Sequence, residues 1–467
     1  FSAAMLLLLV ATRREFQAPP DPPTLFQFVR FVPLYVASVV LYGATYLFLL
    51  RNRTSPDLTL GRTLDTVFSG MVGLQGAYTF DSEFFARVLR VSLAGLGLLG
   101  VILALLLLFR PIVARPQQEP GAWGHANRLV EQYGSDSLAA FALRDDKSFF
   151  FSSDREAMVA YTYIGRYALA SGDPIGRPES LDLVIDEFLA MCQQRAWGVA
   201  FLAVLESERD RYVDRGLHTF YLGDEAVVDC QGFNLKGKKW KSIRQSAQRV
   251  ERTYRFEFLA ETDASPELIG KLNALSAKWR GKAPERGFTM SLSQDLDGSE
   301  PDFRLCVALD ENDEPGGFLR IIPIHAGEPG YTLDLMRRDP DTPNGMTEFL
   351  LTRTIMHLDE GGYRRLSMNF AVWGRLFYED IHYTLPQRAF KQLLELVNPF
   401  YQIKSLKMFN QRFYPEWVPR VIVYDDVRAL PRVGLLYGGV EGFLSVPVIG
   451  RYFLPKTVPH EKPRADH

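Results

Sequence analysis

Residues 333–351, LDLMRRDPDTPNGMTEFLL, join an apolar run to a helical pattern through a proline-rich turn. Polar and turn-forming residues crowd this corner: Asp334, Arg337, Asn344, Gly345 and Glu348. A carboxylate can hold an ammonium group or accept a hydroxyl proton, and an arginine with backbone N–H groups can stabilise an oxyanion. The corner is therefore a candidate site of acyl transfer. The structural alternative is an Asn-Gly turn with a helix cap and a surface ion pair.

The same corner argues against coenzyme A as the acyl donor. In acetyltransferase-type folds a central strand separates from its neighbour, the acyl group lies in the gap, and the next helix N-terminus binds the donor's phosphates. Coenzyme A needs a glycine-rich loop there, roughly Q/R-x-x-G-x-G/A. This chain has PNGM with a single glycine. We therefore predict another donor and no cofactor.

Other residue types give no sharper site. The histidines show neither a triad order nor metal-ligand spacing with nearby carboxylates. Cys192, Cys230 and Cys306 are isolated, which fits a reducing compartment and predicts neither a disulfide framework nor a zinc site. No metal is expected.

Two basic segments are candidate polyanion sites. The first, residues 236–252, holds seven Lys or Arg and one acid, among them Lys238, Lys239, Lys241 and Arg244. In a chain of formal net charge −2, so local an excess favours RNA phosphates or anionic lipid headgroups. The second, residues 403–420, interleaves Lys404, Lys407 and Arg412 with aromatic residues, a pattern suited to unstacked nucleotides. The alternatives are a solvated helix face and an aromatic core stripe.

These residues must be positioned by two kinds of structure. Residues 31–50 and 91–109 are uncharged runs about as long as a bilayer core of roughly 30 Å requires, so we predict transmembrane helices within residues 1–114. Residues 1–11 resemble the end of an earlier span, and the chain begins with Phe1, so we expect it to be a fragment. Arginines flank the spans on both sides and do not decide the topology.

Beyond a linker at residues 115–124, short β-like runs alternate with amphipathic helical patterns, which predicts an α/β or α+β fold. The order of elements restarts near residues 253–263. We therefore predict two related domains, 118–255 and 256–432, with the catalytic site in the second. The apolar, glycine-rich tail 433–467 either packs on the domain or contacts the membrane surface.

With these residues in hand, the soluble part resembles the phosphatidylglycerol lysyltransferase family over about residues 120–430. The motifs are SGDPIG at 171–176, GKKWKSIRQ at 237–245, the corner at 333–351, and SLKMFNQRFYPEWVPR at 405–420. LSMNFA at 366–371 stands where the family usually reads L-S-L-G-F-A, so Asn369 departs from the pattern.

The resemblance implies tandem acetyltransferase-like (GNAT) domains preceded by transmembrane helices, in a multi-pass protein of the cell membrane whose catalytic part is cytoplasmic. It implies transfer of an aminoacyl group, most often lysyl, from aminoacyl-tRNA to a glycerol hydroxyl of phosphatidylglycerol. The catalytic residues would be Asp334, Glu348 and Arg337. Substrate contacts would come from Asn344, Gly345, Asn369, Phe370, Asp173, Lys404, Lys407 and Arg412, and tRNA or headgroup contacts from Lys238, Lys239, Lys241 and Arg244.

Three alternatives remain open at this stage. A Fem-like transferase would use the same donor on a peptidoglycan precursor. The donor amino acid could be alanine or arginine rather than lysine. A catalytically inactive membrane-tethered binder of tRNA or anionic lipid is the third. The oligomeric state is not predicted.

Overall fold

The computed structural model describes residues 22–108, 119–281, 289–292, 295–372 and 403–441. The chain divides into two compact units, residues 1–112 and 113–467, and each is described by itself. The predicted end of an earlier span, residues 1–11, lies outside the described residues. So does most of the tail, residues 442–467.

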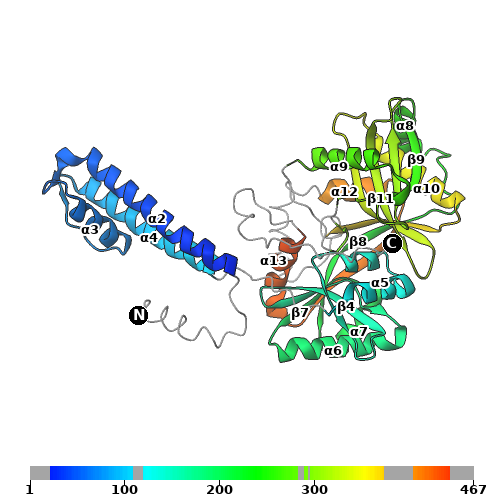
Figure 1. Cartoon of the computed structure of the whole chain (residues 1–467), viewed down its shortest axis with the longest axis horizontal. Coiled ribbons are helices and arrows are strands. Elements are labelled where there is room, and N and C mark those ends of the chain that lie inside the picture. Colours follow the sequence, from blue (N-terminus) through cyan, green and yellow to red (C-terminus); the bar gives the residue numbers. More distant parts are fainter. Residues whose placement is uncertain (1–21, 109–118, 282–288, 293–294, 373–402, 442–467) are drawn as a thin grey trace. The chain divides into compact units, whose positions relative to one another are not determined.

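The first unit is built on two long antiparallel-running apolar helices, α2 and α4 (Figure 1). Its elements are α2 (Pro22–Leu49), β1 (Thr54–Ser55), α3 (Leu60–Met71), β2 (Thr79–Phe80) and α4 (Glu83–Leu108). The Tyr35 hydroxyl donates to the Leu96 carbonyl at 2.7 Å and ties the two helices together. Phe31–Leu49 and Glu83–Ala104 are long and apolar enough to cross a membrane. The helices α2 and α4 contain all but the last residue of the predicted spans 31–50 and 91–109.

The second unit is built around one mixed sheet. Among the described residues it has twelve strands: β3 (Ser148–Phe151), β4 (Ala157–Ile164), β5 (Tyr167–Ser171), β6 (Ile175–Gly176), β7 (Gly198–Leu205), β8 (His218–Asp229), β9 (Arg255–Ala260), β10 (Arg304–Leu309), β11 (Pro315–Ile324), β12 (Gly330–Arg338), β13 (Arg365–Val372) and β14 (Glu416–Tyr424). The helices are α5 (Ala122–Tyr133), α6 (Leu181–Gln194), α7 (Arg209–Val213), α8 (Lys241–Val250), α9 (Pro266–Arg280), α10 (Met346–Glu360), α12 (Ile403–Gln411) and α13 (Leu430–Val440).

The strand order is β3-β4-β5-β7-β14-β8-β13-β12-β11-β10-β9, with β6 paired to β4. Two neighbouring pairs are parallel, β5 with β7 and β12 with β13, and they occupy matching places in the two halves of the sheet. The central strands are exchanged: β8 follows β7 in sequence but pairs with β13, and β14 follows β13 but pairs with β7. The division at residue 255 stays a prediction. Strand β8 of the first predicted domain pairs with β13 of the second, and β14 of the second pairs with β7 of the first.

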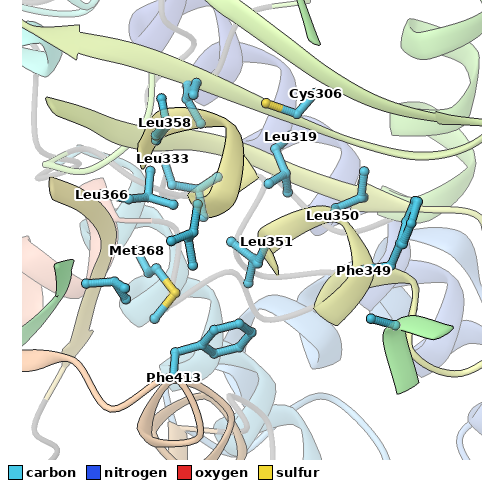
Figure 2. Packing of buried hydrophobic residues seen from close by; sticks show 14 of the residues in the cluster. Cys306, Leu319, Leu333, Phe349, Leu350, Leu351, Leu358, Leu366, Met368 and Phe413 are labelled. Atoms are coloured by element: carbon cyan, nitrogen blue, oxygen red, sulfur yellow. The ribbon is translucent and has the colours of Figure 1, made fainter. Parts of the chain in front are cut away.

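In the half that contains β9–β13, different helices cover the two faces of the sheet (Figure 1). Leu305, Val307 and Phe318 pack on one face beneath α9. Cys306, Leu319 and other residues pack on the opposite face beneath α8 and α10. Because side chains alternate along a strand, these two cores also indicate which face of the sheet the polar residues of the same strands point to. Figure 2 shows the second core, where Leu333 and Leu366 of the two parallel strands meet Leu351 of α10.

Candidate functional site

The parallel strands β12 and β13 form a fork. They pair through Gly330–Arg365, Tyr331–Leu366 and Thr332–Ser367, and no further pairing between them follows in the described residues. On its other edge β13 stays paired with β8 past this point, through Phe370 and Glu225. A β-bulge on β12 also leaves Asp334 without a register partner on β11. Bulges of this kind re-aim side chains beside functional sites, so the sequence corner does begin at an opening in the sheet.

Asn369 lies at the point where the fork opens. Its φ is +63°, a left-handed conformation that Gly adopts freely and Asn tolerates better than most other residues. Its Nδ2 donates to the Leu333 carbonyl at 2.6 Å and to the Met290 carbonyl at 3.1 Å. Its Oδ1 is buried without a hydrogen-bond partner in the described part of the chain. The departure from the family's glycine is therefore compatible with the backbone, and it adds a side chain that bridges the fork.

Asp334 is fully enclosed by protein donors. Its Oδ1 accepts from the Ser291 hydroxyl at 2.9 Å and from the Leu292 N–H at 2.8 Å, and its Oδ2 lies 3.3 Å from Arg320 Nη1. Arg320 also binds Glu261, at 2.7 Å from Nε to Oε2. Burial would lower the pKa of Arg320, but the two carboxylates outweigh it and raise that pKa. These are contacts that fix residues 289–292 across the fork.

Glu348 lies away from Asp334. It is the third residue of α10, which covers the face opposite to α9, whereas Asp334 binds Arg320, which in turn binds Glu261 on the α9 face. Glu348 Oε1 accepts from Arg412 Nη1 at 2.7 Å, and its side chain is 13% exposed. The sheet separates the two carboxylates, so the structure does not bring the predicted pair together in one site.

The other residues of the corner are also divided between the two faces. Arg337 extends along α9, where its guanidinium lies 4.3 Å from the Trp279 ring centre, and burial lowers its pKa to about 10. Gly345 begins α10 at φ +112°, and a Cβ there would lie 2.6 Å from the Ser246 carbonyl oxygen of α8. This glycine is thus required by both its backbone angle and its close contact. Asn344 is exposed beside it.

The two basic segments converge, although 170 positions separate Ser242 from Arg412. Arg412 Nη2 donates to the Ser242 hydroxyl at 3.2 Å. Trp240 meets Tyr414 edge to face, with 5.1 Å between ring centres, and the Lys239 ammonium lies 5.1 Å and 5.0 Å from these two rings. We call the surface formed by Lys238, Lys239, Lys241, Arg412 and Tyr414 the basic surface.

Not every predicted basic residue belongs to this surface. Arg244 folds the preceding loop, donating to the Leu235 carbonyl and to the Gly237 carbonyl at 3.2 Å. Lys407 lies 5.6 Å from the Trp417 ring centre. The side chains of Lys404 and Phe370 lie outside the described residues, although their backbones belong to α12 and β13.

Asp173 follows β5 in the matching fork of the other half. It accepts from the Leu205 N–H at 2.9 Å and the Tyr212 hydroxyl at 3.0 Å, beside a cavity of about 320 Å³. Burial, followed by the nearby Asp136 carboxylate, raises the pKa of Asp173 to about 7. The structure therefore places Asp173 at a second opening and apart from the corner.

Sequence reasoning missed the buried ionic centre between the halves. Arg420 of β14 binds Asp136 at 2.6 Å and Glu225 of β8 at 2.5 Å, and Glu225 also accepts from the Ser367 hydroxyl at 2.5 Å. The Asn369 N–H in turn donates to Ser367 Oγ at 3.2 Å. No spacing in the sequence indicates this network, because its members come from four distant segments.

Comparison with known proteins identifies the family to which this chain is similar. Residues 127–424 match the family model described as phosphatidylglycerol lysyltransferase, C-terminal. The chain is 33% identical over 376 residues to the lysylphosphatidylglycerol biosynthesis bifunctional protein LysX of Rhodococcus opacus, covering 79% of this chain and 33% of that protein. The corresponding protein of Mycobacterium tuberculosis is 30% identical over 448 residues, covering 95% of this chain and 38% of that protein.

Two solved structures share the fold. L-PGS from Bacillus licheniformis is 27% identical with a TM-score of 0.63, covering 70% of this chain and 99% of that one. The C-terminal domain of a putative lysylphosphatidylglycerol synthetase from Agrobacterium fabrum is 25% identical with a TM-score of 0.59, covering 69% and 97%. The chain spans about a third of the length of its curated relatives. Because the family model covers well over half of its residues, the chain belongs to the phosphatidylglycerol lysyltransferase family through the family's C-terminal region.

Proposed function

We propose that this chain transfers a lysyl group from lysyl-tRNA to a glycerol hydroxyl of phosphatidylglycerol. The observation that carries the proposal is the convergence of both basic segments on the basic surface, next to the helix α10 that follows the fork. Such a surface favours a polyanion with unpaired bases, and its affinity should depend on salt. Both substrates of the proposed reaction are anionic.

The chemistry exchanges one ester for another. The bond between the lysyl carbonyl carbon and the tRNA ribose oxygen breaks, and a bond from that carbon to the glycerol oxygen forms. The glycerol hydroxyl loses its proton, and the ribose oxygen gains one. Because little driving force is needed, positioning of the two substrates and help with proton transfer should supply most of the rate.

We assign the residues accordingly. Asp334 acts as a positioning residue that holds residues 289–292 over the fork, because both of its oxygens already bind protein donors. Asn369 Oδ1, which is buried at the fork without a hydrogen-bond partner in the described part of the chain, would accept from a substrate donor. Arg412 binds the RNA, and Glu348 forms an ion pair with it and tempers its charge. The predicted catalytic role of Arg337 and the predicted substrate roles of Asn344, Gly345, Phe370 and Asp173 stay proposals.

The proposed tRNA donor also implies on which side of the membrane the second unit lies. tRNA is cytosolic, so we propose that the second unit lies on the cytoplasmic side of the cell membrane, anchored by α2 and α4 as part of a multi-pass protein. Transfer of alanine or arginine, and transfer to a peptidoglycan precursor, are outcomes that the experiment must separate.

To test the proposal, the full chain is incubated in mixed micelles with phosphatidylglycerol and with tRNA charged with radiolabelled lysine, alanine or arginine. The lipids are then separated by thin-layer chromatography. We expect a labelled lipid from the lysine donor, abolished when the donor is first treated with ribonuclease. Label in another lipid or in an added peptidoglycan precursor would redirect the acceptor. If folded protein binds tRNA but labels no acceptor with any donor, the proposal is wrong.

A further inference from the structure

Tyr414 combines two features that are costly for a residue with no binding role. It is 57% exposed, although it is a large aromatic residue. Its φ is +51°, in the left-handed region that disfavours bulky side chains and favours glycine. The turn after α12 sets this conformation, because the Tyr414 N–H donates to the Gln411 carbonyl at 3.1 Å. Strained residues cluster at binding and active sites, so the strain at this exposed position indicates a binding role.

The ring of Tyr414 has a rigid support. Trp240, only 6% exposed, meets it at an interplanar angle of 80°, and Phe233 packs against Trp240 with 5.1 Å between ring centres. Edge-to-face contacts of this kind fix the orientation of an aromatic ring. The platform is therefore held in place from beneath by a residue of the first basic segment, while Tyr414 itself belongs to the second.

One cation lies over this ring, and other cations belong to the same basic surface. The Lys239 ammonium lies 5.0 Å from the ring centre, and Lys238 and Lys241 are exposed on the same loop and helix start. Arg412, two residues before Tyr414, is oriented by Ser242 and Glu348. An exposed aromatic face with ammonium and guanidinium groups beside it matches a nucleobase with its flanking phosphates.

We propose that Tyr414 is the stacking platform for an unpaired base at the 3′ end of RNA, and that Lys239 and Arg412 bind the phosphates on either side. The inference rests on the proposed function for the identity of the RNA, which would be the single-stranded end of the charged tRNA. RNA is favoured over a lipid headgroup because glycerol phosphate has no ring to stack on the exposed aromatic surface.

The test is fluorescence anisotropy of a labelled single-stranded RNA oligonucleotide ending in ACCA-3′, titrated with the full chain in detergent micelles. Tyr414→Gly removes the ring and relieves the backbone strain, so we expect RNA affinity to fall by about 5- to 100-fold while the melting temperature stays equal or rises. Tyr414→Phe keeps the ring and should bind nearly as the wild type does. Trp279→Ala is the matched control, because Trp279 is another exposed aromatic beside an arginine but lies on α9, over the opposite face of the sheet.

Three results would overturn the inference. One is unchanged RNA affinity in Tyr414→Gly, and another is an equal loss in Trp279→Ala. The third is that soluble dihexanoyl-phosphatidylglycerol loses affinity for Tyr414→Gly whereas RNA does not, which would assign the ring to the lipid. The lipid-transfer assay separates this inference from the proposed function: RNA binding that depends on Tyr414 in a chain that transfers nothing would support the platform and refute the reaction.

Discussion

Asn369 donates a hydrogen bond of 2.6 Å to the Leu333 carbonyl, across the point where β12 and β13 separate. This bond joins the strand that carries the polar corner to β13, which stays paired with β8 beyond the fork. In the matching fork of the other half, Ala203 has a φ of +62°, and it has no side-chain amide to make such a bridge. The two forks thus share a backbone conformation, and Asn369 makes one of them distinct.

At most positions an alanine variant is more stable than a glycine variant, and we expect the reverse at Asn369. Asn369→Gly loses the two side-chain hydrogen bonds, a cost of about 1–3 kcal/mol, but keeps the favoured backbone angle. Asn369→Ala loses the same bonds and adds roughly 1–2 kcal/mol of left-handed strain. We therefore expect melting temperatures to fall in the order wild type, Gly, Ala, measured on the full chain in detergent.

Asn312 provides the matched control for this order. It is exposed in a turn and is not among the residues with positive φ. Asn312→Gly should be no more stable than Asn312→Ala. If Asn369→Ala proved more stable than Asn369→Gly, the left-handed conformation would not be what limits this position.

The sequence predicts the fold type well, because its signals are local. Uncharged runs predict the two long apolar helices, and alternating strand and helix patterns predict the mixed sheet. The exchange of β8 and β14 cannot be read from such patterns, since neither strand differs in composition from one that stays in its own half. Pairing of distant strands is set by the whole sheet.

The candidate site is less predictable for the same reason. Asp334 and Glu348 are fourteen positions apart in sequence. The Asp334 side chain lies on the α9 face of the sheet, whereas Glu348 belongs to α10 on the opposite face. The bulge at Asp334 places its carboxylate toward Arg320, and only the register of β11 and β12 reveals this. The basic and aromatic composition of residues 236–252 and 403–420 predicts two polyanion-binding segments, and that prediction stays untested; the contact between the segments is visible only in the structure.

Asp173 should make stability depend on pH. Its pKa is raised to about 7, so the folded chain binds more protons than the unfolded chain between about pH 4 and 7. The contribution of Asp173 to the free energy of unfolding therefore falls as pH rises through that window. Asp173→Asn, which keeps an acceptor for the Leu205 N–H, should stabilise the chain at pH 8 by about 2.7 kcal/mol relative to its effect at pH 5, because about two pH units of the window lie between pH 5 and the raised pKa.

Chemical unfolding of the full chain at the two pH values measures this difference. The exposed Asp263, replaced by Asn, serves as the control and should show no such dependence. An equal effect of Asp173→Asn at pH 5 and pH 8 would mean that Asp173 is ionised in the fold.

Arg420 should be sensitive to substitution, because it is a buried cation held by two carboxylates. Burial would lower its pKa, but Asp136 and Glu225 raise it above the ordinary value, so it stays charged. Arg420→Met would leave two carboxylates buried without their partner, at a cost of about 3–5 kcal/mol. The unfolding midpoint in urea measures this loss. Arg428→Met, at an exposed position, is the control.

A triple variant tests the reason for that loss. Combining Arg420→Met with Asp136→Asn and Glu225→Gln removes all three charges, and we expect it to recover much of the stability lost in the single variant. If the triple variant were as unstable as Arg420→Met alone, the packing of the arginine side chain, and not the uncompensated charge, would account for its importance.

Arg412 and Glu348 should act on RNA binding with opposite signs. They form one ion pair of 2.7 Å at the edge of the basic surface, so each partly cancels the other's field. Arg412→Gln removes a phosphate-binding cation, and we expect weaker binding and a reduction of about one in the slope of log affinity against log salt. Glu348→Gln frees the guanidinium, so the same oligonucleotide should bind more tightly and with a steeper slope. Anisotropy titrations across a range of KCl concentrations measure both, with Arg428→Gln as the control. If the two substitutions shifted affinity in the same direction, the pair would serve the fold of α8, α10 and α12 and would not bind phosphate.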